Sequence, residues 1–299
     1  KKKKKMAIES EKALEGLINR LESLEVLISE RDVRIFNLET ALKAAESKIQ
    51  NKKDNEKVRV MNADEKGMGH GSMGWMEEDT SKFYSAPAER NKDDILKVLE
   101  KHLSEEKEGL IIEIGSGSGQ HISHFAKAFP LLQFQPTEYP GHPNPKADKQ
   151  DIDKILTSIS SYTKNISNIV KPCYLDASIL DENNEICKDN EVLMFISINI
   201  VHVSPLTVME GILKGSSKKL KLNGKLLFYG PWSLNNGIIK GDGNIKFNKT
   251  LKELNNDYGI RDINELEMMA NSYGLSLIDT ILFESSNNYC LVLQKNISN

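Results

Sequence analysis

Three alternating glycines follow a short apolar segment and precede an amphipathic one. The run reads Leu110-Ile-Ile-Glu-Ile-Gly-Ser-Gly-Ser-Gly119, and Glu113 is its only acid. An apolar segment that leads through glycines into an amphipathic stretch, here 122–129, predicts a buried strand, a turn and a helix. Glycines let backbone N–H groups approach a ligand closely, and the start of a helix has unpaired N–H groups. The turn is therefore predicted to bind a ligand, with a tight connection that binds nothing as the alternative.

The spacing of these glycines indicates which ligand to expect. A dinucleotide fingerprint, G-x-G-x-x-G, requires glycine at position 120, where the chain has Gln120. The observed pattern, E-x-G-x-G-x-G, is typical of enzymes that use S-adenosylmethionine, in which the acid lies near the cationic methionine end of the cofactor. We therefore predict S-adenosylmethionine as the cofactor. The residues predicted to hold its methionine end are Glu113, Gly115, Ser116, Gly117 and Gly119.

Two acids further along the chain suit the adenosine part of this cofactor. Glu138 follows the second predicted strand, 19 residues after Gly119, and a carboxylate there can accept hydrogen bonds from both ribose hydroxyls. Asp176, followed by Ala177, ends the third predicted strand, where the acid could accept from the adenine amino group. The alternatives are that Glu138 is an ordinary loop acid and that Asp176 bonds only its own backbone, as Asp often does in turns.

The fourth predicted strand ends at Asn199, and His202 follows three residues later. We expect both side chains to face the transferred methyl group. The ordinary pKa of histidine lies near working pH, so His202 can act as a general base towards the acceptor. The alternative is a structural histidine bonded to a neighbouring carbonyl, since methyl transfer often needs only proximity and alignment.

Further polar and aromatic residues are expected to gather above the sheet and bind the acceptor. Two of them are arginines, which would favour a small anionic or carboxylate-bearing molecule. Arg261 beside Asp262 could instead form a surface ion pair, and Arg90 could cap a carboxylate. The complete set of predicted substrate residues is Tyr84, Arg90, Tyr229, Trp232, Arg261, Asn287 and Asn288.

Strand and helix patterns alternate through the elements that must position these residues. Such alternation predicts an α/β fold of the Rossmann-like kind, with a mostly parallel sheet that binds ligands beyond the carboxyl ends of its strands. The tight Ser285-Ser-Asn-Asn288 connection makes the last strand antiparallel. Ser81 or Ser85 is expected to cap the first helix. The predicted strands are 110–114, 132–136, 171–175, 192–198, 225–229, 275–283 and 289–294, and the predicted helices after the first are 121–129, 152–162, 206–220 and 263–273.

Residues 82–295 resemble the uncharacterised methyltransferase-like family of the DUF938 type, the family of methyltransferase-like protein 26. The resemblance implies a class I S-adenosylmethionine-dependent methyltransferase fold and identifies no acceptor. Two departures are visible: Glu138 stands where the family usually has Asp, and Glu284-Ser-Ser286 replaces Met-Pro-Ala. The blocks that carry the resemblance are Ala88-Glu-Arg-Asn-Lys92, Glu113-Ile-Gly-Ser-Gly-Ser-Gly-Gln-His121, Phe125-Ala-Lys-Ala-Phe-Pro130, Asn199-Ile-Val-His-Val-Ser-Pro205, Tyr229-Gly-Pro231, Tyr258-Gly-Ile-Arg-Asp262 and Asn287-Asn288.

The N-terminal residues have a different organisation. Apolar residues at steps of three and four from Leu14 to Ile49 form a five-heptad seam that only Arg31 interrupts. This seam predicts a coiled-coil helix that forms a parallel homodimer or binds a partner helix; a single helix packed on the domain is the alternative. We assign 1–57 to a basic tail and this helix, 58–80 to a flexible linker rich in Gly and Met, and 81–299 to the methyltransferase-like domain.

Composition narrows the class of protein further. The chain has 299 residues, 39% of them hydrophobic and 28% charged, with a net charge of −3. Nucleic acid is thus an improbable partner, and no apolar run reaches the roughly 18 residues of a membrane span. Three cysteines without a CxxC pair argue against disulfides and zinc, and we expect no metal and a cytoplasmic location, with the nucleus still open. We predict a methyltransferase; the alternative is a non-catalytic cofactor-binding module whose coiled coil serves as a scaffold.

Overall fold

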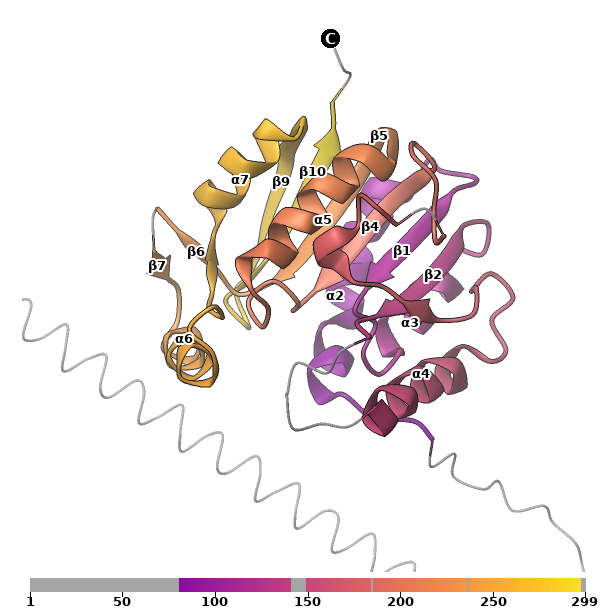
Figure 1. Ribbon diagram of the computed structural model, residues 1–299, viewed down its shortest axis with the longest axis horizontal. Coiled ribbons are helices and arrows are strands. Elements are labelled where there is room, and N and C mark those ends of the chain that lie inside the picture. The colour runs from indigo at the N-terminus through magenta and orange to yellow at the C-terminus, as the bar shows by residue number, and fades with distance from the viewer. Residues whose placement is uncertain (1–80, 141–148, 184, 236, 297–299) are drawn as a thin grey trace, which may run out of the picture. The chain divides into compact units, whose positions relative to one another are not determined.

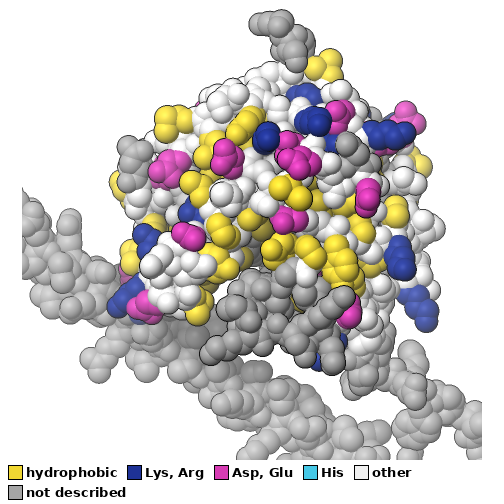
Figure 2. Space-filling model, in the orientation of Figure 1, with side chains coloured by type: hydrophobic (Ala, Val, Ile, Leu, Met, Phe, Trp, Pro, Cys, Tyr) yellow, Lys and Arg dark blue, Asp and Glu magenta, His cyan; other side chains and the backbone are white. Residues whose placement is uncertain are grey.

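The computed structural model describes residues 81–140, 149–183, 185–235 and 237–296. The basic tail, the coiled coil predicted at 14–49 and the linker predicted at 58–80 lie outside these residues and stay predictions. In the described ranges no helix is both long enough and apolar enough to cross a membrane. On the face of the domain seen in Figure 2, Lys and Arg side chains are interspersed with Asp and Glu, without an extended basic patch among the described residues of that face.

A seven-stranded sheet forms the centre of the domain, in the order β3-β2-β1-β4-β5-β10-β9 (Figure 1). Neighbouring strands from β3 to β5 are parallel, whereas β10 is antiparallel to both β5 and β9. The predicted α/β class, with a mostly parallel sheet and an antiparallel last strand, is confirmed. The strands are β1 (Leu110–Ile114), β2 (Gln133–Glu138), β3 (Cys173–Tyr174), β4 (Val192–Ile198), β5 (Leu220–Gly230), β9 (Leu275–Phe283) and β10 (Asn288–Lys295).

The strand order reverses between β1 and β4. After β1 the chain adds β2 and β3 on one side and then returns to place β4 on the other side of β1. Side chains and loops that follow β1 and β4 therefore diverge, which opens the position where ligands bind in sheets of this kind. All seven residues of β4 are buried, as expected of a central parallel strand covered on both faces.

Helices cover both faces of the sheet, as the alternating sequence pattern predicted. The first begins at its predicted cap, because the Ser85 side chain accepts from the Ala88 N–H at 3.3 Å and Pro87 occupies the first turn. The helices that pack on the sheet or border it are α2 (Ala86–Leu103), α3 (Gln120–Ala128), α4 (Lys149–Thr163), α5 (Leu206–Lys219) and α7 (Ile263–Ser272), and a short 3₁₀ helix, η1 (Ala177–Ile179), follows β3.

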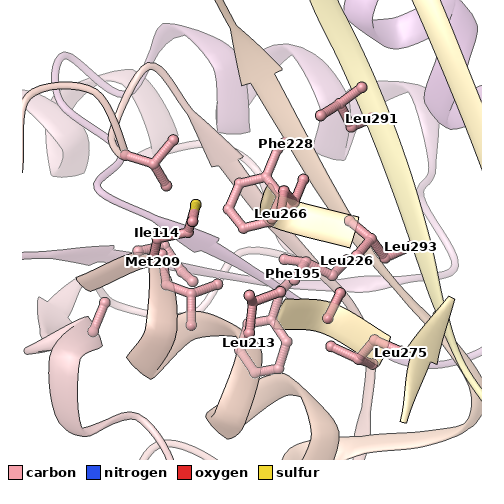
Figure 3. Packing of buried hydrophobic residues seen from close by; sticks show 14 of the residues in the cluster. Ile114, Phe195, Met209, Leu213, Leu226, Phe228, Leu266, Leu275, Leu291 and Leu293 are labelled. Carbon is pink, nitrogen blue, oxygen red and sulfur yellow. The ribbon is translucent and has the colours of Figure 1, made fainter. Parts of the chain in front are cut away.

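Two hydrophobic clusters lie on opposite faces of the sheet, because successive strand residues point to opposite sides. Phe195 of β4 joins the cluster under α5 and α7, while its neighbour Ile196 joins the cluster under α2 and α3. Figure 3 shows the first cluster, in which Leu213 of α5 lies with Phe195 and with Leu226 of β5. This double-sided core fixes the strands whose ends carry the candidate site.

One connection contains elements that the sequence pattern did not predict. Between β5 and α7 the chain forms a small three-stranded sheet, in the order β7-β6-β8, and an additional helix. The helix has a single buried residue, Leu251, so it packs only lightly on the rest of the domain. These elements are β6 (Trp232–Leu234), β7 (Ile238–Ile239), α6 (Asp242–Leu254) and β8 (Arg261–Asp262). They border the carboxyl ends of β4 and β5.

Candidate functional site

The glycine turn joins β1 to α3 in the left-handed backbone region that favours glycine. Gly115, Gly117 and Gly119 have φ angles of 70°, 54° and 91°. A Cβ atom built at Gly117 would meet no protein atom within 4 Å, so the turn faces open space there. Buried Ser116 attaches the turn to the neighbouring strand, since its N–H donates to the Thr137 carbonyl at 2.8 Å. The turn is thus held in place and leaves room for a ligand beside Gly117.

Glu113 lies beneath this turn in β1, with its side chain only 1% exposed. Burial raises the pKa of Glu113 to about 8; the Ser116 side chain acts in the opposite direction, and the negative charge of Glu138 adds to the rise. Within the part of the chain that the structure describes, its Oε2 atom is buried without a hydrogen-bond partner. A buried carboxyl group with an unused acceptor suits a cationic ligand group. The methionine end of S-adenosylmethionine, with its sulfonium and amino groups, fits this requirement.

Glu138 ends β2 and contacts the same turn. Its Oε2 accepts from the Gly117 N–H at 2.9 Å, and its Oε1 accepts from the Tyr139 N–H at 3.1 Å. The two carboxylates, Glu113 and Glu138, therefore belong to adjacent parallel strands that end beside one glycine turn. The predicted neighbourhood of Glu138 and the glycines is present, and its role towards a ribose is taken up below.

Asp176 and Ala177 follow β3, the outer strand on this side. The Leu175 N–H donates to the Glu138 carbonyl at 2.8 Å, which places the end of β3 beside the end of β2. Asp176 caps η1, because its Oδ1 accepts from both the N–H and the hydroxyl of Ser178, at 2.9 and 2.6 Å. The alternative of an Asp that bonds its own turn is thus observed, while contact with an adenine stays a prediction. Ala177 is 6% exposed and packs in the core.

Asn199 and His202 lie together beyond β4, next to the end of β5. Asn199 has a φ of 58°, and its N–H donates to the Tyr229 carbonyl at 2.8 Å. Gly230 faces both side chains: a Cβ atom built there would lie 3.2 Å from the Asn199 Oδ1 and 3.1 Å from the His202 Cε1. The structure therefore brings together the two residues predicted to face the methyl group.

His202 is nearly inaccessible, with 3% of its surface exposed. Burial, with a further contribution from the positive charge of Arg261, lowers the pKa of His202 to about 4, so its imidazole is neutral at physiological pH. Its Nδ1 atom has no hydrogen-bond partner in the described ranges, so the alternative of a histidine bonded to a neighbouring carbonyl is not observed at that atom. Phe247 of α6 packs edge-on against the ring, with 5.5 Å between ring centroids.

Arg261 contacts the main chain around this histidine and does not point towards an acceptor. Its Nε donates to the Val201 carbonyl at 3.1 Å, and its Nη2 donates to the carbonyls of Ser204 and Asp257 at 2.6 and 2.7 Å. Arg261 does not form the alternative ion pair with Asp262. The Asp262 carboxylate instead accepts hydrogen bonds from the Ser233 hydroxyl and from backbone N–H groups. Arg261 was predicted as a substrate ligand, and its placement supports a different role.

Tyr229, Asn287 and Asn288 lie close together at the ends of β5 and β10, as predicted. The Asn288 Nδ2 donates to the Tyr229 hydroxyl at 3.3 Å, and the tyrosine ring packs against Phe283. The carbonyl of Asn287 accepts from the Asn244 Nδ2 of α6 at 2.9 Å. This turn is therefore attached to the helix that covers His202.

The other predicted substrate residues are placed differently. Tyr84 is 69% exposed, just before α2, and Arg90 is exposed on that helix. Trp232 is 1% exposed and packs edge-on against Phe228 in the hydrophobic core, where its Nε1 has no hydrogen-bond partner among the described residues. The structure thus places it in the core beside β5, and its contact with an acceptor stays a prediction.

Sequence reasoning missed the function of Gln120 in attaching α2 to the glycine turn. The Gln120 Oε1 accepts from the Ser85 N–H at 2.5 Å, and its Nε2 donates to the Glu89 carboxylate at 3.1 Å. Beside it, the Ser158 hydroxyl of α4 donates to the Ser118 carbonyl at 2.9 Å. The available sequence signal was a glutamine directly after the last glycine of the turn, together with the Ala88–Lys92 block.

The seven-stranded sheet, its strand order and the glycine turn after β1 define the fold of class I S-adenosylmethionine-dependent methyltransferases. Within that class, the chain belongs to the family described as protein of unknown function DUF938, whose model matches residues 82–295. The resemblance seen in the sequence is thereby confirmed.

Solved structures with the same fold are distant in sequence. The match to the CurJ carbon methyltransferase has 15% identity and a TM-score of 0.52, and it covers 71% of this chain and 56% of that one. The match to human N-acetylserotonin methyltransferase in complex with SAM has 13% identity and a TM-score of 0.51, and it covers 71% of this chain and 53% of that one. A Galdieria sulphuraria protein described as a sarcosine dimethylglycine methyltransferase matches with 13% identity and a TM-score of 0.52. That match covers 74% of this chain and 94% of the other. This chain thus spans little more than half of the first two proteins, and the likeness establishes the fold alone.

Proposed function

We propose that the domain binds S-adenosylmethionine and transfers its methyl group to a small-molecule acceptor. The observation that carries this proposal is the glycine turn between two carboxyl groups, buried Glu113 at the end of β1 and Glu138 at the end of β2. A turn of this kind at the point of strand reversal has room for a ligand beside Gly117 and an unused acceptor for a cation beneath it.

The residues on the cofactor side would act by binding and orientation. When bound, S-adenosylmethionine supplies an electrophilic methyl group on a sulfonium. Glu113 would stabilise the positive charge of the methionine end, and Glu138 would accept from the ribose hydroxyls with the oxygens that now accept from backbone N–H groups. Asp176 and Ala177 would border the adenine at the next strand end.

The residues on the acceptor side would orient the nucleophile and accept its proton. The neutral imidazole of His202 can take up a proton at Nδ1, but its pKa of about 4 makes it a weak base, so its main contribution would be to accept a hydrogen bond from the nucleophile. The Asn199 side chain beside it can hold a donor or acceptor group of the molecule to be methylated. His202 is 3% exposed, with Phe247 packed against its ring and Gly230 next to Nδ1, so an acceptor reaches Nδ1 only if these surroundings shift. Two arginines favoured an anionic acceptor in the sequence. Arg261 donates to main-chain carbonyls instead, so only Arg90 still supports that acceptor class.

Calorimetry and a methylation screen test the proposal in sequence. Isothermal titration with S-adenosylmethionine and with S-adenosylhomocysteine should show one-to-one binding that weakens when Glu138 is replaced by alanine. A screen with radiolabelled cofactor and a fractionated metabolite extract should then show label transfer that the Asn199→Ala protein does not catalyse. Absence of cofactor binding would reject the proposal, and binding without transfer to any fraction would leave a non-catalytic cofactor-binding module.

A further inference from the structure

The turn between β4 and α5 carries both residues of the proposed acceptor side. It starts with Asn199 in a left-handed conformation, φ 58°, which an L-residue adopts at some cost. The turn is short, and its internal support includes the Val203 N–H donating to the Ile200 carbonyl at 3.0 Å. A strained turn of this kind keeps one conformation only when its surroundings hold it there.

Arg261 supplies such support from a distant part of the sequence. Its guanidinium donates to two carbonyls of this turn, those of Val201 and Ser204, and to the carbonyl of Asp257 in the loop before β8. The Gly259 N–H adds a bond from the same loop to the His202 carbonyl at 3.0 Å. One planar side chain therefore joins the acceptor-side turn to the β8 loop on both sides of His202.

We infer that Arg261 is a positioning residue: it holds the Asn199–His202 turn in the conformation that presents both side chains to the acceptor. This inference rests on the proposed function, because only that function makes the Asn199–His202 turn the acceptor side of the site. A guanidinium suits this task because its donors lie in a rigid plane and can reach several carbonyls at once, whereas a lysine ammonium is a single point on a flexible chain.

Two substitutions separate the geometry of Arg261 from its charge. Arg261→Lys keeps a positive charge and cannot reproduce the three carbonyl contacts, whereas Arg261→Met removes both. Among the charged groups of the described residues, Arg261 on β8 is the one that lowers the pKa of His202, after burial; Phe247 of α6 and Gly230 of β5 cover the ring without charge. The negative charges of Glu265 and Asp257 act on the guanidinium, whose contact with Asp257 is to the main-chain carbonyl.

Nuclear magnetic resonance of full-length protein with labelled histidines reads out the turn without any acceptor. The His202 signal is assigned with a His202→Gln variant. We expect Arg261→Met to raise the pKa of His202 from about 4 towards its ordinary value and Arg261→Lys to change it less. In both variants the Val203 and Gly259 amides should exchange about tenfold faster or more, because the loop bonds open more often.

Kinetics supply the second readout once an acceptor is known. Both variants should keep the wild-type affinity for S-adenosylmethionine, because the glycine turn and Glu138 are untouched, while kcat falls by roughly 10- to 100-fold through misplacement of the acceptor-side groups. Loss of cofactor affinity together with kcat would indicate general damage and would overturn the inference.

Asn168 provides a matched control. Its Nδ2 also donates to three main-chain carbonyls, those of Ala126, Phe129 and Leu132 at 3.0, 3.0 and 2.8 Å, in the last turn of α3 and its connection to β2. Asn168→Ala should lower the melting temperature without changing the His202 signal or the Val203 exchange. The inference is overturned if Asn168→Ala changes them as much as Arg261→Met does, or if Arg261→Met changes neither. These measurements stand even if no cofactor binds, an outcome that would reject only the proposed function.

Discussion

The Glu138 carboxylate accepts the Gly117 N–H at 2.9 Å and thereby links the end of β2 to the turn after β1. The two elements expected to contact the ribose and the methionine end of the cofactor are thus joined before any ligand arrives. Such an arrangement lowers the ordering that binding would otherwise require. It also makes Glu138 a residue whose replacement should affect cofactor binding more than folding.

Replacement of Glu138 by alanine is expected to weaken S-adenosylhomocysteine binding by about 10- to 100-fold. The reason is a net loss equivalent to one charge-assisted hydrogen bond to the ribose, worth about 1.5–3 kcal/mol. Titration calorimetry measures the change. Glu191→Ala is the control, since Glu191 also accepts a backbone N–H, that of Lys188 at 2.7 Å, but lies just before β4, at the opposite end of the strand from the site. Equal affinities for Glu138→Ala and wild type would contradict the ribose assignment.

Gly117→Ala should reduce cofactor affinity about tenfold or more, because the added methyl group would occupy the open space beside the turn. The left-handed backbone also costs an alanine about 1–2 kcal/mol of folding stability. Gly274→Ala is matched in both respects: φ is 73° and a Cβ atom there meets nothing within 4 Å, but the residue lies between α7 and β9. Thermal unfolding should show similar losses for the two variants, and calorimetry should show a binding defect for Gly117→Ala alone.

Glu113 should make cofactor binding depend on pH. With a pKa raised to about 8, the free protein carries a protonated Glu113 at pH 6–7, and a cationic ligand favours the carboxylate. Binding should therefore release a proton, and affinity should rise with pH up to about 8, by at most roughly tenfold per pH unit. Calorimetry in buffers of different ionisation enthalpy measures the proton release. Glu113→Gln should lose this contribution, and an unchanged proton release in that variant would exclude Glu113 as its source.

The same group should affect the stability of the free protein. A carboxyl group whose pKa is raised on folding, here from 4.5 to about 8, makes the folded state bind more protons than the unfolded one. Stability from this source is present below about pH 4.5 and is lost as pH rises to about 8. The melting temperature of Glu113→Gln should therefore increase relative to wild type over that range.

Phe247→Ala should expose His202 and raise its pKa above about 4, because burial is the main cause of the low value. Phe247 is itself 38% exposed, so the melting temperature should change little. Ile245→Ala, which truncates another exposed apolar side chain of α6, is the control. Histidine titration by nuclear magnetic resonance compares the variants, and an unchanged His202 in Phe247→Ala would show that the phenylalanine does not control access to it.

The predicted N-terminal coiled coil has its own test in the full-length chain. Leu24→Glu places a charge in the heptad seam and should convert a dimer into monomers, whereas Arg31→Leu completes the seam and should tighten the dimer. Sedimentation equilibrium distinguishes these states. A wild-type chain that sediments as a monomer would reject the homodimer and leave a partner helix or an intramolecular helix.

Several elements could be predicted from the sequence because local residues determine them. The bounds of β1 and β4 match the prediction, since continuous apolar runs ending in glycine or asparagine form buried central strands. The antiparallel β9–β10 pair follows from its tight connection, and Ser85 caps α2 as its position suggested. The neighbourhood of Glu138 and the glycine turn follows from parallel topology alone, because adjacent strands end at the same edge.

Other features depend on contacts that leave no local signal. The strands β6, β7 and β8 have only two or three residues each, and tertiary bonds such as the one from Ser233 to Asp262 hold them together. The Arg261 guanidinium donates to the carbonyl of a residue 60 positions away in the sequence. Every residue has a carbonyl, so the sequence holds no signal for this contact. For Trp232 the sequence could not tell core from ligand surface, because an aromatic ring suits both.

The connection from β5 to α7 separates the two sides of the candidate site. It contributes β6, β7, α6 and β8 as one continuous segment, and it shares no strand with the β1–β3 half that carries the glycine turn, Glu138 and Asp176. Substitutions within this segment can therefore change the surroundings of His202 while the other half keeps its geometry. Under the proposed function, acceptor specificity and cofactor affinity can thus be altered independently of each other in this protein.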